Sequence, residues 1–323
     1  MNIATTRRAA LLGAGAFLAA PRLAHAQAWP DKPVRIVVAF PPGSSTDVLA
    51  RALGNALQPV LGQPVVVENR PGAGGNIATV AVKRGPADGS VFLAHSVAFS
   101  VNPSLFGNAG YEATEFEPVA MLASTPNIIT VNPEKLQVGN LQDLIAAAKS
   151  RPLDYGSSGI GTTTHLGMEL LFRRLAGVEI QHVPFGPAQA VTAVVGGQVP
   201  VGSTSLPPAL PMVRDGRLRG IAVTSLRRDP SLPEVPTVAE QGFTGFEALT
   251  WFGMFAPPGT PAAICDRMNA EVNRALNSAE LAQRLNAAGF APDPRPRDDF
   301  AAYLRDEVTK WADVVRASGA TAN

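Results

Sequence analysis

Apolar runs alternate with amphipathic segments along most of the chain. Val34 to Phe40 is an apolar run rich in β-branched residues and interrupted only by Arg35, which predicts a buried strand. Asp47 to Leu61 repeats apolar residues at helical spacing and predicts a helix. Val65 to Glu68 and Val91 to His95 repeat the strand pattern, with a helix between them. Continuous apolar strands joined by helices are typical of a parallel sheet covered on both faces.

A second set of strands and helices follows the first. Its predicted segments are Ile128 to Val131, Leu141 to Ser150, Asp154 to Gly156, Thr162 to Ala176, Glu179 to Val183, Ala188 to Gly196, Val199 to Thr204 and Leu218 to Thr224. Two such sets in one chain predict two α/β domains.

The last part of the chain is mainly helical. Only Trp251 to Ala256 reads as a strand, and the predicted helices after it are Thr260 to Asn277, Leu281 to Ala288 and Asp298 to Ala317. These elements are too few for a third domain, so we expect the strand to re-enter the first sheet. The predicted division is 27–124 plus 250–323 for lobe 1 and 125–249 for lobe 2. Two crossings favour a hinge and a ligand site in the cleft between the lobes.

The N-terminus has the features of an export signal. Arg7 and Arg8 precede an apolar run from Ala9 to Ala20, and Ala24-His25-Ala26 supplies small residues for cleavage. The run is too short for a membrane span. We expect residues 1–26 to be removed near Ala26 and the mature protein to lie free in the periplasm. The twin arginine and ordinary secretory routes both stay open.

Charge and cysteine content exclude other classes of protein. Cleavage removes three arginines, so Lys plus Arg falls from 27 to 24 against 26 Asp plus Glu, and the net charge becomes −2. A near-neutral chain without a basic run is not expected to bind nucleic acid. Cys265 is the single cysteine, so no disulfide forms within the chain, and we expect a buried, inert thiol.

The segment DYGSSGIGTTTHL, residues 154–166, concentrates glycines and hydroxyls between a strand and a helix. The glycines allow close backbone approach to a ligand, and the helix start offers unpaired N–H groups that suit an anion. A Ser/Thr cap after a Gly-rich turn explains the same residues without a ligand. The segment by itself leaves both interpretations open.

Ligands of open α/β sheets bind beyond the carboxyl ends of the strands, which selects a set of loops. Those loops are Phe40 to Asp47, Gly72 to Gly75, Ser96, the segment at 154–166 and Pro184-Phe185-Gly186. Two Gly/Ser/Thr loops that face each other across a cleft favour a ligand cradle. The predicted ligand-binding residues are Phe40, Pro42, Gly43, Ser44, Ser45, Asp47, Ala73, Gly74, Ser96, Ser158, Gly161, Thr162, His165, Phe185, Ser203 and Thr204.

Catalytic and cofactor patterns are missing at these loops. A nucleophile elbow requires Gly-x-Ser-x-Gly, and neither Ser157 nor Ser158 fits it. No histidines stand at metal-ligand spacing, and neither Gly-x-Gly-x-x-Gly nor Gly-Lys-Ser/Thr occurs where a nucleotide would need it. We therefore predict no catalytic residue, metal or cofactor. Asp47 and Arg51 are also explained by a helix ion pair that fixes the preceding loop.

Several spaced motifs resemble one receptor family. Pro41-Pro42-Gly43 with Asp47 and Arg51, and Val67 to Gly75, match the first-lobe pattern of the tripartite tricarboxylate transporter substrate-binding receptors, also called Bug receptors. Later motifs that look like the same family are Tyr155 to Leu166, His182 to Phe185, Gly196 to Val199, Leu232 to Thr237 and Ala256 to Pro261. The resemblance covers about Pro33 to Trp311.

The resemblance implies a type II periplasmic binding protein, a Venus flytrap whose lobes are mainly parallel sheets flanked by helices. Such receptors close on a small carboxylate and deliver it to integral-membrane permease subunits, and we expect a monomer. A sensor protein as partner, or a hydrolase on a similar cleft, are the alternatives.

Three departures from the family pattern bear on specificity. Family members often carry glycine where Ser44 stands and tyrosine where Phe185 stands. The segment Gly202 to Pro208 also replaces a more usual acidic and aliphatic sequence. We hypothesise a ligand with an apolar or aromatic part beside its carboxylate.

Overall fold

The computed structural model describes residues 29–318 and 321–322, so the predicted signal at 1–26 lies outside the described residues. The described strands form one ten-stranded sheet in the order β2-β1-β3-β9-β4-β7-β5-β6, with β8 and β10 also paired to β4. The strands are β1 (Val34–Val38), β2 (Val65–Asn69), β3 (Val91–Ser96), β4 (Glu117–Val131), β5 (Asp154–Ser157), β6 (Gln181–Pro184), β7 (Val201–Ser205), β8 (Arg219–Val223), β9 (Leu249–Ala256) and β10 (Ala291–Pro292).

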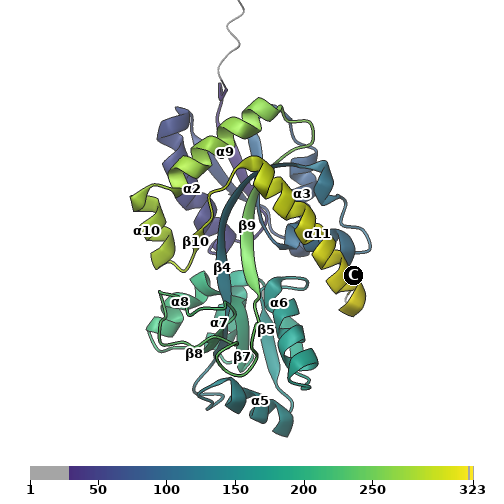
Figure 1. The fold of residues 1–323 in the computed structure, drawn as a ribbon, viewed down its shortest axis with the longest axis vertical. Helices are drawn as coiled ribbons and strands as arrows, with labels where there is room; N and C mark the ends of the chain where they lie inside the picture. The colour runs from purple at the N-terminus through teal and green to yellow at the C-terminus, as the bar shows by residue number, and fades with distance from the viewer. Residues whose placement is uncertain (1–28, 319–320, 323) are drawn as a thin grey trace, which may run out of the picture.

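Helices cover the sheet on both faces (Figure 1). They are α2 (Ser45–Leu61), α3 (Asn76–Lys83), α4 (Ala98–Leu105), α5 (Leu141–Ser150), α6 (Thr163–Met168), α7 (Pro187–Val195), α8 (Leu206–Arg214), α9 (Ala262–Leu276), α10 (Ala279–Ala287) and α11 (Arg297–Ser318). Two short 3₁₀ turns, η1 (Ala73–Gly75) and η2 (Ala113–Glu115), and a π-helix, η3 (Glu169–Leu175), complete the described elements.

Two long strands connect the two ends of the molecule. Strands β1, β2 and β3 pair in parallel, as do β5, β6 and β7, whereas every antiparallel pairing involves β4 or β9. Figure 1 shows β4 and β9 running side by side through the waist between an upper and a lower body. Strand β4 pairs with β9 as far as Pro126 and with β7 and β8 from Asn127 onward.

The return of β9 to the first sheet agrees with the sequence. Strand β9 pairs antiparallel with β3 from Phe252 to Phe255, so the strand predicted at Trp251 to Ala256 does re-enter that sheet. The division into lobes at 124/125 and 249/250 stays a prediction, because one sheet is continuous through both bodies.

Side-chain alternation along β1 explains why four of its five residues are apolar. Val34, Ile36 and Val38 belong to a core cluster under α2, α9 and α10, and Val37 belongs to a second cluster on the other face of the sheet. Strand β1 is therefore buried on both faces except at Arg35, whose exposed side chain pairs with Glu68. Cys265 lies fully buried in the first of these clusters, so the predicted burial is confirmed, and burial raises the thiol pKa to about 11.

The sequence prediction missed some elements. Residues 117–126 of β4 and the helices α4 and α8 were not predicted. Three prolines interrupt the helical pattern of α8, yet two of them stand in its first turn, where no intrahelical N–H donor is needed. The single helix predicted from Thr162 to Ala176 divides into α6 and the π-helix η3.

Candidate functional site

A cavity lies between the start of α2 and the loop before α6, close to the waist of the molecule. Its free volume is about 30 Å³, which is enough for about two water molecules or for the two oxygens of a carboxylate, and not for a whole small molecule. Ten of its lining residues carry a hydroxyl and none is charged. We call it the central cavity, and its lining is Phe40, Ser44, Ser45, Thr46, Ser96, Val97, Ser158, Thr162, Thr163, Thr164, Pro187, Ser205, Thr250 and Phe252.

Asp47 holds the loop on the α2 side of the cavity. Its carboxylate accepts hydrogen bonds from the Gly43 backbone N–H and from Asn69 Nδ2, both at 2.9 Å, and pairs with Arg51 at 2.9 Å. Burial disfavours the charged carboxylate, but hydrogen bonds from Arg51, Gly43 and Asn69 outweigh this and hold the pKa of Asp47 below its ordinary value. Asp47 therefore positions the loop and does not itself line the cavity.

The loop on the opposite side is held by its own hydroxyls. Thr162 Oγ1 donates to the Gly159 carbonyl at 2.7 Å and lies 2.7 Å from Thr164 Oγ1, which accepts from the Ser158 N–H at 3.1 Å. In contrast, Ser158 Oγ is buried and has no hydrogen-bond partner among the described residues. Buried hydroxyls are normally paired, so this one is available to a ligand.

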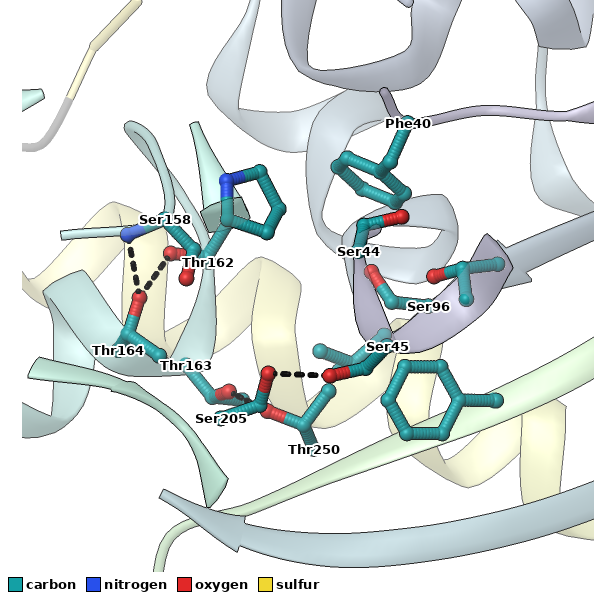
Figure 2. A pocket seen from close by; sticks show the side chains of 14 residues that line it. Phe40, Ser44, Ser45, Ser96, Ser158, Thr162, Thr163, Thr164, Ser205 and Thr250 are labelled. Atoms are coloured by element: carbon teal, nitrogen blue, oxygen red, sulfur yellow. Dashed lines mark hydrogen bonds between the residues drawn. The ribbon is translucent and has the colours of Figure 1, made fainter. Parts of the chain in front are cut away.

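Two direct contacts close the cavity from below. Ser45 Oγ, at the start of α2, lies 2.7 Å from Ser205 Oγ at the end of β7. Thr163 Oγ1 lies 2.5 Å from Thr250 Oγ1 on β9, and Thr250 Oγ1 donates to Asn127 Oδ1 at 2.8 Å. Figure 2 shows the hydroxyls of Ser45 and Ser205 meeting at the floor of the cavity.

A second cavity opens beside the first. Its free volume is about 320 Å³, and it shares Phe40, Ser158 and Pro187 with the central cavity. We call it the mouth cavity, and its other lining residues are Ala39, Pro41, Pro71, Gly72, Ala73, Gly74, Gly75, Phe106, Gly159, Ile160, Pro184, Phe185, Gly186 and Ala322.

Comparison with known proteins identifies the family. Residues 49–320 match the family described as the tripartite tricarboxylate transporter family receptor. The chain belongs to this family. It is 39% identical over 324 residues to protein BugT of Bordetella pertussis, with 98% of each chain covered.

Solved structures support the same assignment. Rpa4515 of R. palustris, solved with adipate, is 35% identical with a TM-score of 0.87, and the match covers 91% of this chain and 99% of that one. MatC from Rhodopseudomonas palustris, with bound malate, is 32% identical with a TM-score of 0.82, covering 89% of this chain and 100% of that one. The fold of this receptor is thus that of the periplasmic binding proteins, and the family acts as solute receptors.

The structure brings most of the predicted site residues of this receptor to the two cavities. Those that line the central cavity are Phe40, Ser44, Ser45, Ser96, Ser158 and Thr162. Ala73, Gly74 and Phe185 line the mouth cavity. The predicted residues outside both linings are Pro42, Gly43, Asp47, Gly161, His165, Ser203 and Thr204.

The end of β7 explains the misplacement of Ser203 and Thr204. We predicted the strand to end at Thr204, whereas it continues through Ser205, which is the residue that reaches the cavity. Thr204 pairs with Ile128 of β4 and its hydroxyl is buried without a partner among the described residues.

His165 supports the loop from behind. Its Nδ1 accepts a hydrogen bond from the Gly161 N–H at 3.2 Å, and its ring stacks on His182 at 4.0 Å between centroids. Burial lowers the pKa of His165 to about 4, so the ring is neutral at pH 7.

Sequence reasoning missed several lining residues. They are Thr46, Val97, Thr163, Thr164, Pro187, Ser205, Thr250 and Phe252. Thr163 and Thr164 were visible within the hydroxyl-rich segment. Thr250 gave no local signal, because only the pairing of β9 with β4 brings it to the cavity.

A hydrogen-bonded pair of a serine and a histidine lies outside both cavities. Ser157 Oγ lies 2.6 Å from His182 Nε2, yet neither residue lines a cavity and Ser157 is fully buried. Burial and the neighbouring His165 lower the pKa of His182 to about 3, which makes it a poor base. Residues 29–318 and 321–322 hold no group of three or more metal-ligating side chains and no helix long and apolar enough to cross a membrane.

Proposed function

We propose that this protein is a periplasmic receptor that binds a small carboxylate in the central cavity and delivers it to a tripartite tricarboxylate-type permease. The observation that carries the proposal is a buried ring of ten hydroxyls without a charged side chain, in which Ser158 Oγ is unpaired. The solved relatives with adipate and malate are further support, since both of those ligands are carboxylates.

The proposed carboxylate site combines hydroxyl groups with the backbone N–H groups at the N-terminus of α2. Ser44, Ser45 and Thr46 place the first turn of α2 at the cavity, and the first N–H groups of a helix have no partner within it. Hydrogen bonds to a charged group contribute about 1.5–3 kcal/mol each, so four or five can reach the roughly 8 kcal/mol of micromolar binding. A cationic side chain is therefore not required.

A thermal-shift screen followed by calorimetry tests the proposal. The mature protein is screened against dicarboxylates, amino acids and aromatic acids, with uncharged amides of the same acids as controls. A ligand at one hundred times its dissociation constant adds about 2.7 kcal/mol of stability, which raises the Tm measurably. Stabilisation by the amides as strong as by the acids, or by no acid at all, contradicts the proposal.

The membrane partner is tested separately in cells. Uptake of the labelled ligand is expected to be lost when the receptor gene is deleted and restored by the wild-type gene. Unchanged uptake together with an altered transcriptional response favours a sensor protein as the partner. Size-exclusion chromatography with light scattering tests the proposed monomer.

A further inference from the structure

The mouth cavity differs sharply in chemistry from the central cavity. Among the described residues that line it, Ser158 is the single one with a polar side chain, and none is charged. The remaining lining is aromatic, aliphatic, proline, alanine and glycine. A ligand group in this space contacts apolar surface.

Three half-exposed apolar side chains form the walls of the mouth cavity. Phe106 follows α4, Ile160 lies in the loop before α6, and Phe185 follows β6. They come from both bodies of the molecule and leave apolar surface open to solvent, which is a feature of ligand and partner sites.

The wall residues are held in place by close packing. Atoms of the Phe185 ring lie 3.1 Å from the position that a Cβ on Gly156 would take, so the missing side chain makes room for the ring. Phe106 donates its N–H to the Asn102 carbonyl at 3.0 Å and forms a β-bridge with Ala322, which also lines the cavity. The apolar walls are therefore fixed by contacts within the protein.

Ser158 stands at the junction of the two cavities. Ser158, whose hydroxyl is unpaired, lines both cavities. Figure 2 shows Ser158 and Phe40 on opposite sides of the central cavity. Because the two cavities share Phe40, Ser158 and Pro187, a molecule with its carboxylate in the small central cavity would extend past these residues into the mouth cavity.

We propose that the mouth cavity is the subsite for the apolar body of an aryl or alkyl monocarboxylate. The inference rests on the proposed function and names the ligand class for the same site. A second carboxylate in the mouth cavity would lose water without meeting a cation or a hydroxyl other than Ser158. An alkyl or aryl group gains from leaving water at the same place.

The backbone at Gly72 to Gly75 is the one feature that favours a different ligand. All four residues have positive φ, including Ala73 at 47°, so successive N–H groups turn near the mouth. The Gly75 N–H already donates to the Gly72 carbonyl at 2.9 Å. Capture of a second carboxylate by the remaining N–H groups is the result that would overturn the proposal.

Matched acid pairs separate the two ligand classes on the wild-type protein. Hexanoate and adipate share a six-carbon chain, and benzoate and terephthalate share a ring, so each pair differs by one carboxylate. Calorimetry is expected to show the monocarboxylate binding at least about tenfold more tightly in each pair, since burial of an unpaired charge is costly. Equal or tighter binding of adipate and terephthalate overturns this inference while the proposed function stands. If no acid in the broader screen binds, the proposed function itself is contradicted.

Two variants test the location of the subsite. Ile160→Lys puts a cation at the mouth and is expected to reverse the preference within each pair. Phe185→Ala is expected to weaken the binding of hexanoate and benzoate at least about fivefold, because apolar contact is lost.

Leu226→Ala, at an exposed leucine outside both cavities, is the matched control. Circular dichroism checks that each variant is folded. Unchanged affinities in Phe185→Ala together with an unchanged preference in Ile160→Lys place the apolar body elsewhere and overturn the assignment.

Discussion

Individual hydroxyls around the central cavity have different tasks. Ser45 and Ser205 contact each other, and Thr162 and Thr164 hold their own loop. Ser158 is distinguished by an Oγ that no described residue satisfies. Hydroxyls that hold the walls of the cavity together are thus distinguished from Ser158, whose buried hydroxyl has no partner among the described residues.

Ser158→Ala is expected to weaken carboxylate binding with the free protein equally stable. A hydrogen bond to a charged group is worth about 1.5–3 kcal/mol, which corresponds to a rise in Kd of at least about tenfold. Calorimetry measures the Kd and thermal unfolding measures the Tm. Ser150→Ala is the control, since Ser150 is exposed and its Oγ donates to the Ala147 carbonyl away from the cavity. Equal affinities of wild type and Ser158→Ala contradict the role given to this hydroxyl.

Thr162→Val is expected to weaken binding by a different route. The substitution removes the hydrogen bond to the Gly159 carbonyl and the contact with Thr164, so the loop loses support. We expect the unfolding free energy to fall by about 1 kcal/mol as the Kd rises, with the fold retained. Urea denaturation checks the first effect and calorimetry the second. A Kd that rises with no loss of stability would mean that Thr162 acts directly on the ligand.

At the scale of elements, helix α2 and its preceding loop are joined through one carboxylate. Asp47 lies in the first turn of α2, accepts from Gly43 in the loop and from Asn69 at the end of β2, and pairs with Arg51 one turn later. The side chain of Asp47 is only 5% exposed, so these hydrogen bonds are shielded from water. The carboxylate thus connects a strand, a loop and a helix at the edge of the cavity.

Asp47→Asn is expected to destabilise the protein at pH 7 and much less at pH 3. The folded-state pKa of Asp47 is lowered, so its stabilising contribution is present above the unfolded-state pKa of about 3.9 and is lost as the pH falls through the folded-state value. Urea denaturation of both proteins at each pH measures the difference. Asp215→Asn, at an exposed aspartate, serves as the control. A destabilisation that is the same at both pH values would show that charge is not the source.

At the scale of the whole molecule, the described histidines are all kept neutral. Burial lowers the pKa of His95 and of His165 to about 4, and burial together with His165 lowers that of His182 to about 3. None of these three side chains lines the central cavity or the mouth cavity. They make the stability of the fold sensitive to mild acid.

The unfolding free energy is expected to fall as the pH is lowered from 7 to 5. The unfolded histidines take up protons below about pH 6.5 whereas the folded ones do not, so each costs roughly 1–2 kcal/mol of stability over this interval. Urea denaturation at several pH values gives the slope. The double variant His165→Gln with His182→Gln is expected to show a shallower slope than the wild type. A slope that is unchanged in the double variant contradicts the assignment.

The two-body shape also predicts a change on ligand binding. The bodies are connected through β4 and β9, and the hydroxyl contacts of Ser45 with Ser205 and of Thr163 with Thr250 bring them together at the cavity. If the proposed lobes open without ligand, small-angle scattering should show a smaller radius of gyration when a saturating carboxylate is added. A radius that does not change would contradict the proposed division into moving lobes.

The local pattern of apolar and polar residues was sufficient to predict most of the strands and helices. The run from Val34 to Phe40 predicted β1, and the helical spacing after it predicted α2 within two residues of its start. The pattern failed where pairing partners decide the structure. Residues 117–126 contain the apolar run Val119 to Ala123 between two prolines, and only the pairing with β9 shows that the first part of β4 extends through both prolines.

The sequence by itself determined the family, most of the strands and helices, and the presence of uncharged, hydroxyl-rich loops, because these features depend on residues close together in the chain. Only the tertiary structure decided which hydroxyls form the cavity. Ser205 and Thr250 join Ser45 and Thr163 because β7 and β9 pair with β4, and such long-range pairing leaves no local trace in the sequence. The separation into a hydroxyl-lined central cavity and an apolar mouth is likewise a result of this pairing.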